Sequence, residues 1–183
     1  MKVVKFAAVA LAASLSAVAL AASAPVMVGG APMYSSKDII DNAVNSKDHT
    51  TLVAAVKAAG LVDTLKGKGP FTVFAPVDAA FAALPAGTVD TLLKPENKAQ
   101  LTKVLTYHVV AGKMDSAALT KAIDAGGGKA TLTEVSGGTL TATRSGSTIM
   151  LADESGGMAH VTIPDVVQSN GVIHVVDKVL LPK

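Results

Sequence analysis

A nearly continuous hydrophobic run lies between Asn170 and Pro182. It opens with Gly171, whose backbone can turn freely, and continues with four β-branched residues, Val172, Ile173, Val175 and Val176. Such a run, with little polar interruption, is typical of a strand that is buried on both faces. Pro182 has no amide proton for a strand ladder, so it ends the segment. The pattern predicts a central strand against which the rest of the chain packs.

Upstream of this run the pattern changes from helical to strand-like along the chain. The spacing of Leu52, Ala55, Val56 and Ala59 predicts a helix that ends at Gly60. Shorter apolar stripes predict helices within residues 36–44, 61–65, 79–84, 89–93, 95–105 and 114–123. Strands are predicted within residues 71–75, 106–111, 129–135, 139–144, 147–152 and 158–163. Because most helices precede most strands, the expected fold class is α+β.

Residues 1–24 have the features of a secretory signal peptide. Lys2 and Lys5 give a positive start, residues 6–20 are apolar and rich in alanine, and small residues follow. We expect cleavage near Ala21 and a protein that is secreted or periplasmic. The apolar run is too short for a good membrane anchor, so no transmembrane segment is expected.

The remainder of the chain fits one domain. Residues 25–35 include two Pro and two Gly and lack a hydrophobic period, so they are expected to form a flexible tether. Residues 36–183 then form the folded domain, which is of ordinary size for a single core.

Charge and composition exclude some classes of function. Without Lys2 and Lys5 the 16 basic residues fall to 14, which equals the 14 acidic residues. Aromatic residues make up 3% of the chain and Arg144 is its single arginine, so a basic, aromatic nucleic-acid surface is not expected. The chain contains no Cys, so its stability depends on the apolar core alone.

Asp78 and His108 are the most suggestive polar pair in the sequence. They could form a general acid–base couple, or a buried hydrogen bond that ties two strands together. Asp78 is also placed to cap the predicted helix 79–84. Because no nucleophile motif or third polar group accompanies the pair, we favour the structural interpretation and expect no enzymatic activity.

Metal and phosphate sites are not indicated. The four histidines (His49, His108, His160 and His174) lack ligand spacing, although His160 and His174 could meet across strands. The segment from Gly126 to Lys129 resembles the end of a phosphate-binding loop, but Ala130 stands where Ser or Thr is required. No metal or other cofactor is therefore expected.

Three segments together resemble the fasciclin-like domain family: Thr72 to Phe81, Tyr107-His108-Val-Val, and Asn170 to Pro182. They match the family's first box, its Tyr-His motif and its second box, in the same order and with similar separation. The resemblance covers residues 36–183, and Val77 departs from the small hydroxyl residue that is usual in the first box. The residues that carry the motifs are Thr72, Phe74, Pro76, Asp78, Phe81, Tyr107, His108, Asn170, Gly171 and His174.

The resemblance implies a wedge-shaped β-sandwich with a layer of helices, which lie mostly in the N-terminal half of the chain. It also implies a role in cell adhesion and matrix contact. In animal relatives an Asp-hydrophobic pair before the second box is tied to integrin binding. The matching candidates for binding here are Pro164, Asp165 and Val166.

The expected function is that of a secreted, non-catalytic module for cell adhesion or matrix interaction. Its partner would be a protein or polysaccharide at a cell surface or in a matrix, and the module would be a monomer or a weak homo-oligomer. An alternative is a carrier that holds an apolar small molecule, such as a carotenoid or haem, in a groove.

Overall fold

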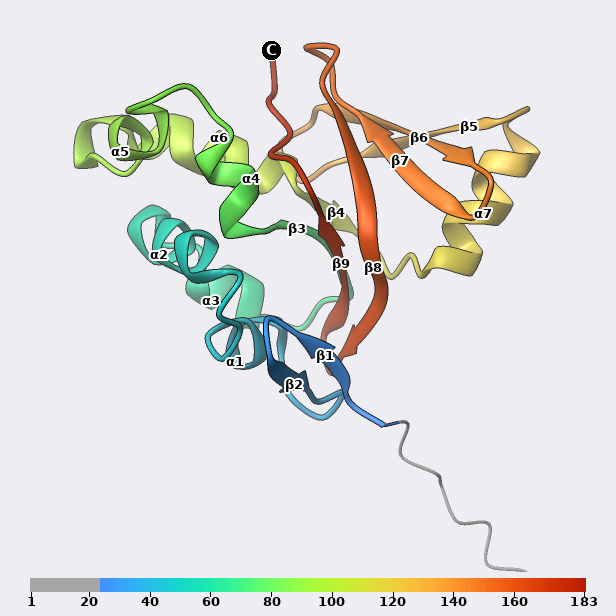
Figure 1. Ribbon diagram of the computed structural model, residues 1–183, viewed down its shortest axis with the longest axis horizontal. Helices are drawn as coiled ribbons and strands as arrows, with labels where there is room; N and C mark the ends of the chain where they lie inside the picture. The colour runs from blue at the N-terminus through green and yellow to red at the C-terminus, as the bar shows by residue number, and fades with distance from the viewer. Residues whose placement is uncertain (1–23) are drawn as a thin grey trace, which may run out of the picture.

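The computed structural model describes residues 24–183 (Figure 1). The predicted signal peptide and its cleavage near Ala21 therefore lie outside the described residues, apart from Ala24. Within residues 24–183, every helix is too short or too polar to cross a membrane.

Seven strands form one sheet in the spatial order β4-β3-β9-β8-β7-β6-β5. The strands are β3 (Phe71–Pro76), β4 (Val109–Ala111), β5 (Lys129–Thr133), β6 (Thr139–Ser145), β7 (Thr148–Ala152), β8 (Met158–Gln168) and β9 (Gly171–Val176). β9 runs parallel to β3 and antiparallel to β8, and all six of its residues are buried. The prediction of a central strand near the end of the chain is confirmed.

The sheet rolls until its two outermost strands approach each other. Val110 of β4 forms an isolated bridge with Glu134, which directly follows β5, and the Val135 amide donates to the Val109 carbonyl over 2.9 Å. Apolar side chains from all seven strands meet inside the roll together with α7 (Ser116–Ala125). The closed side of the roll is therefore one of the two cores of the protein.

The second core lies between the other face of the sheet and a layer of helices. These are α1 (Ile39–Ala43), α2 (Thr50–Ala59), α3 (Val62–Lys66), α4 (Asp78–Ala82), α5 (Thr88–Leu92) and α6 (Lys98–Tyr107), with a 3₁₀ turn at Pro95–Asn97. Figure 1 shows this layer on one side of β3 and β9, with β5, β6, β7 and α7 on the other. The fold is the predicted α+β class, and six of the seven α-helices found in residues 24–183 precede β4.

In α2 the hydrophobic pattern of the sequence agrees with the burial seen in the structure. Its four apolar residues at helical spacing are all buried, and Gly60 ends the helix with a φ of 73°, which favours glycine. They disagree at residues 106–111, where a strand was expected from Thr106. α6 continues through Tyr107 because that side chain is buried inside the roll, and β4 begins only at Val109.

The predicted flexible tether over residues 25–35 is wrong. β1 (Val26–Val28) and β2 (Ala31–Met33) form a hairpin whose turn is Gly29-Gly30, with φ values of 57° and 73°. Two glycines with positive φ favour a tight hairpin turn. Val28, Ala31 and Met33 face the helical core, so the segment is held by apolar burial. The strands are only three residues long, which hid their alternation in the sequence.

Glu134 is an unusual residue at the closure of the roll. Its side chain is buried, Ser136 Oγ donates to Oε2 over 3.3 Å, and Oε1 has no hydrogen-bond partner among the described residues. Burial, together with the charge of Glu154, raises the pKa of Glu134 to about 8. The neutral carboxyl is therefore the form that suits the folded state.

The first prediction concerns this carboxyl. Because the pKa is raised on folding, its contribution to stability is complete below the ordinary value of 4.5 and is lost as pH rises toward about 8. Glu134→Gln should flatten the fall of the melting temperature across this range, measured by circular dichroism. The exposed Glu96→Gln variant serves as the control and should keep the wild-type slope. An unchanged slope in Glu134→Gln would show that the carboxyl is ionised in the folded protein.

Candidate functional site

The motif residues surround the parallel pair of strands β3 and β9, and Asn170 stands at its entrance. Its Oδ1 accepts from the Ile39 amide over 3.1 Å, and its Nδ2 donates to the Leu65 carbonyl over 2.7 Å and to that of Gly67 over 3.1 Å. One amide side chain thus joins α1 and the end of α3 to the central strand. At Gly171, a Cβ would collide with the Phe71 carbonyl, so only glycine fits beside β3.

Asp78 does not contact His108. Its carboxylate accepts from the Thr51 amide over 2.8 Å and from the Thr50 hydroxyl over 2.6 Å, and so caps the first turn of α2. Partial burial works against ionisation, but these hydrogen bonds from Thr50 and Thr51 hold the pKa of Asp78 below its ordinary value. The expected Asp78–His108 bond is wrong, and so is the expected capping of α4 by Asp78.

His108 instead connects α6 to the C-terminal segment. Its Nδ1 lies 2.8 Å from the Val104 carbonyl, so that nitrogen carries the proton, and Nε2 accepts from the Leu180 amide over 3.0 Å. Burial lowers the pKa of His108 to about 4. The imidazole is a neutral structural link, as the structural interpretation of His108 expected, although with different partners.

His174 plays a similar part in the middle of β9. Its ring stacks on Phe74 with 5.7 Å between centroids, and its Nε2 lies 2.8 Å from the Met114 carbonyl. Nδ1 then accepts from the Asp165 amide over 3.4 Å. Burial lowers the pKa of His174, so this ring is also neutral.

The three candidate binding residues lie in an irregular part of β8, and their side chains have different surroundings. Pro164 is exposed, whereas Val166 is buried in the helical core. Asp165 has a φ of 57° and is half-buried; its carboxylate accepts from the Ser116 amide over 2.6 Å and from the Ser116 hydroxyl. Asp165 therefore satisfies the first turn of α7.

The remaining motif residues are also engaged internally. Thr72 Oγ1 donates to the Gly112 carbonyl over 2.7 Å and accepts from the Met114 amide over 2.8 Å. Tyr107 donates to the Thr139 carbonyl over 2.8 Å, and burial raises the pKa of its hydroxyl to about 12. Phe74, Pro76 and Phe81 are buried apolar residues.

The histidines do not assemble into a metal centre. His160 pairs with Asp177 over 3.0 Å, whereas His174 contacts Met114 and Asp165, so the possible His160–His174 meeting is wrong. Within residues 24–183, no three His, Cys, Asp or Glu side chains are grouped to hold an ion.

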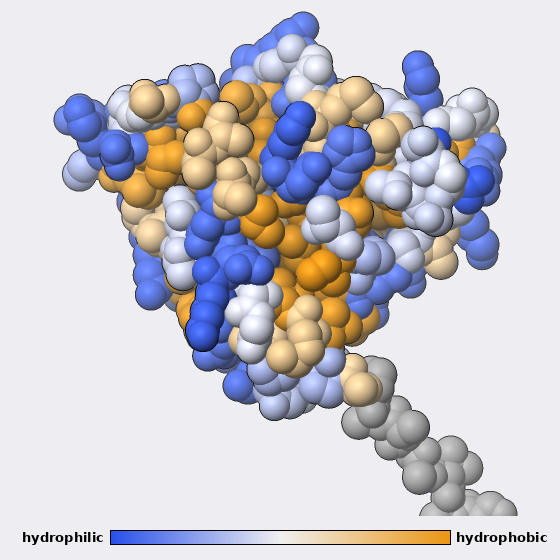
Figure 2. All heavy atoms as spheres, viewed as in Figure 1, coloured by the Kyte–Doolittle hydropathy of each residue, from blue (hydrophilic) through white to orange (hydrophobic). Residues whose placement is uncertain are grey.

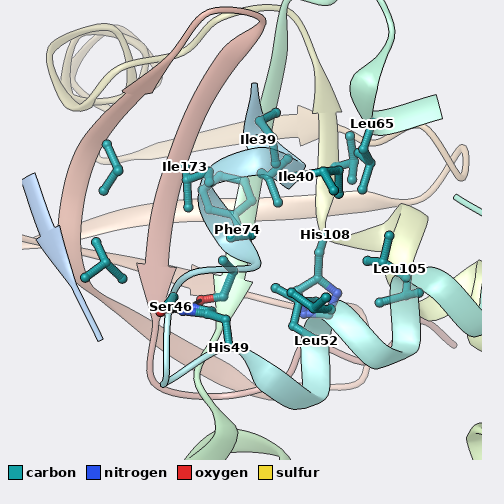
Figure 3. Close-up of a pocket in the computed structure, with 18 of the residues that line it drawn as sticks. Ile39, Ile40, Ser46, His49, Leu52, Leu65, Phe74, Leu105, His108 and Ile173 are labelled. Carbon is teal, nitrogen blue, oxygen red and sulfur yellow. Dashed lines mark hydrogen bonds between the residues drawn. The ribbon is translucent and has the colours of Figure 1, made fainter. Parts of the chain in front are cut away.

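A cavity between α1, α2 and the sheet was not found by sequence reasoning. Figure 3 shows its apolar lining, with Ser46 and His49 on one wall and His108 on another. Ser46 Oγ lies 2.8 Å from His49 Nδ1, and His49 Nε2 lies 3.4 Å from the Ala75 carbonyl. Both residues are buried, and burial lowers the pKa of His49. The one sequence signal was the spacing of Ser46 and His49, three residues apart before a helix.

The Ser46–His49 pair has the appearance of a nucleophile and its base, but its surroundings are structural. A side chain at Gly29 would collide with Ser46 Oγ, so the β1–β2 turn lies directly against the hydroxyl. No carboxylate hydrogen-bonds to His49 within residues 24–183, and the second ring nitrogen faces a backbone carbonyl. The pair joins the hairpin, α2 and β3.

The second prediction tests the link made by His108. His108→Ala removes two buried hydrogen bonds and leaves a cavity, so the free energy of unfolding should fall by about 2–4 kcal/mol in urea titrations. His160→Ala removes a half-exposed hydrogen bond to Asp177 and should cost less than about 1 kcal/mol. Equal losses in the two variants would contradict the assigned role.

The third prediction concerns Asp165. Asp165→Ala loses both bonds to Ser116 and places Ala at positive φ, so unfolding should become easier by about 1–3 kcal/mol. Asp165→Asn keeps an acceptor oxygen and tolerates this φ, so it should lose less stability. Thermal unfolding of both variants checks this, and a neutral Asp165→Ala would show that the carboxylate is not a cap.

Comparison with known proteins gives several matches that span most of this chain. The chain is 46% identical over 157 residues to Protein sll1483 of Synechocystis, covering 85% of this chain and 79% of that protein. It is 35% identical over 195 residues to the immunogenic protein MPB70 of Mycobacterium bovis, covering 93% and 92%. It is also 32% identical to the pig transforming growth factor-beta-induced protein ig-h3, covering 82% of this chain but 20% of that longer protein.

The fold has a counterpart among solved structures. A FAS1 domain pair from the insect cell adhesion molecule fasciclin I superposes with a TM-score of 0.71 at 18% identity, covering 79% of this chain and 51% of that one. The model of the fasciclin domain matches residues 47–182, which is most of the chain. The protein therefore belongs to the fasciclin domain family.

Proposed function

We propose that this protein is a non-catalytic interaction module that attaches to a protein or polysaccharide at a cell surface or in a matrix. The observation that carries the proposal is that the polar motif residues are engaged in internal hydrogen bonds. Asn170, Asp78, His108 and His174 each hydrogen-bond to backbone groups of distant segments, His108 through the Leu180 amide. These residues hold the fold together, which leaves its outer surface for function. The shared fold with a domain pair of an insect adhesion molecule agrees with this role.

The outer face of the β1–β2 hairpin is our candidate for the attachment surface. Met27 lies opposite Pro32, and Tyr34 follows on the same face by strand alternation. Met27 is 55% exposed and Tyr34 43% exposed, and Lys37 Nζ lies 5.4 Å from the Tyr34 ring centre. Figure 2 shows hydrophobic side chains gathered next to the hairpin on the face in view. Exposed apolar residues beside a cation are typical of contact surfaces.

The Pro164–Asp165–Val166 segment supports attachment less well than the hairpin. Only Pro164 presents an exposed side chain there, since Asp165 holds α7 and Val166 is buried. A partner could reach the edge of Asp165 without displacing α7, but it would gain little area.

The carrier alternative finds little support in the cavity. Its volume is about 50 Å³, whereas sites for drug-sized ligands measure roughly 300–1,000 Å³. A haem or a carotenoid would require the helices to separate from the sheet.

The proposal includes export of the chain. Cleavage near Ala21 would leave the hairpin almost at the new N-terminus, free to meet a partner outside the cytoplasm. We propose that the mature module is a monomer or a weak homo-oligomer. Intact-mass and light-scattering measurements on protein from the producing cells test both points.

The fourth prediction tests attachment and its surface together. Microspheres coated with the protein should be retained on the producing cells or their matrix more than albumin-coated microspheres. Met27→Ser/Tyr34→Ser should reduce retention at least threefold, because apolar contact area is lost. Met158→Ser, a matched control at a 43% exposed methionine of β8, should leave retention unchanged.

Two results would contradict the proposed attachment through the hairpin. Retention no greater than that of albumin would contradict an attachment function. Strong retention that is insensitive to the hairpin variant, or equally reduced by Met158→Ser, would show that another surface is responsible.

A further inference from the structure

The cavity under the helical layer is small, apolar and open on one side. Its walls come from α1, α2, α3, the sheet and the end of α6, with side chains such as Ile40, Leu105 and Ile173 (Figure 3). Val56 of α2 also lines it. A volume of about 50 Å³ is several times the roughly 10–15 Å³ that one water-sized group needs. The space therefore admits about three or four non-hydrogen atoms.

The polar groups on the cavity wall offer nothing to an occupant. Ser46 donates to His49, and His49 faces the Ala75 carbonyl. His108 uses both ring nitrogens, one toward Val104 and one toward Leu180. Water needs two to four polar partners to occupy such a space, so an apolar group is the better occupant.

The rim of the cavity has a different character. It is formed by the half-buried side chains of Ala43, Val53 and Val62 and by the exposed Lys57. Val53 and Lys57 are four residues apart, so they lie on one face of α2. Lys57 is the only charged residue that lines the cavity in the described part of the chain, and it makes no ion pair there.

The acidic residue of α1 does not compete for Lys57. Asp41 Oδ1 accepts from Lys66 Nζ over 2.6 Å, and this ion pair ties α1 to α3. Lys57 therefore presents an uncompensated positive charge beside an apolar opening. Such an arrangement complements a molecule with a short apolar chain and a single anionic end.

We propose that the cavity binds the apolar end of a free short-chain carboxylate, whose carboxylate group pairs with Lys57 at the rim. The terminal carbons fill the space beside Ile40 and Val56, and the remaining chain crosses the rim between α1 and α2. This binding goes beyond attachment to a surface and does not depend on it, because the hairpin's outer face and the cavity rim are different surfaces. Binding also fills a packing defect in the helical core, so the ligand should stabilise the fold.

The fifth prediction uses hexanoate and hexanol as probes of the purified protein, followed by methyl and amide chemical shifts. Hexanoate should cause saturable shifts centred on Ile39, Ile40 and Val56. Lys57→Met should weaken hexanoate binding about threefold to fivefold, as expected for an exposed ion pair, and should leave hexanol binding unchanged. Lys121→Met, on the distant α7, is the matched control and should behave as wild type.

A second variant tests the cavity itself. Ala43→Phe places a large side chain at the rim, so it should abolish the shifts from both probes while the protein stays folded. The proposal is overturned if hexanoate gives no saturable shifts below its micelle concentration, or if Ala43→Phe leaves the shifts unchanged. It is equally overturned if Lys57→Met and Lys121→Met bind hexanoate with the same affinity. An unfolded Ala43→Phe would be replaced by Val53→Phe, which closes the same rim from α2.

Discussion

The structure depends on the complete burial of β9. A strand with no exposed residue must have both of its edges paired and both of its faces covered. β3 and β8 satisfy the edges, while the helical layer covers one face and the rolled sheet the other. The two cores of the protein are thus consequences of a single apolar strand, and the segments that meet there come from the whole length of the domain.

Burial on this scale leaves backbone groups that need hydrogen-bond partners away from water, and three histidines provide such partners in the same way. In His49, His108 and His174, one ring nitrogen faces a backbone carbonyl and the other faces an amide or a hydroxyl. Burial lowers the pKa of each ring, so each remains neutral and both nitrogens are used. A neutral imidazole is a compact connector between two backbone segments. This explains why residues with the appearance of catalytic groups are instead parts of the framework.

The sequence predicted those features whose signal lies within a single segment, and it missed those that depend on contacts between distant segments. β9 and α2 were evident because hydrophobic period and end-capping glycine lie within one segment. The predicted interactions of Asp78 were wrong because a carboxylate at the start of one helix can cap a different helix. Only the packing of α2 against α4 determines which helix Asp78 caps. Glu134 lies between a strand and a polar turn, a setting in which glutamate is normally exposed, so nothing local announced its burial. The cavity had no local signal beyond the Ser46–His49 spacing, because it results from imperfect filling between elements that are distant in sequence.

The pairing of β3 with β9 also has a consequence for how the chain acquires its structure. Phe71 aligns with Gly171, so the parallel pair closes a loop of 100 residues. Closing so large a loop costs conformational entropy, which is offset only when the apolar cores are complete. Topologies of this kind fold slowly. Until β9 is in place, β3 and β8 are not joined, so the β3–β4 part of the sheet and the β5–β8 part meet only at the bridge between Val110 and Glu134. The domain should therefore become fully compact only in one late step, after its last strand has been made.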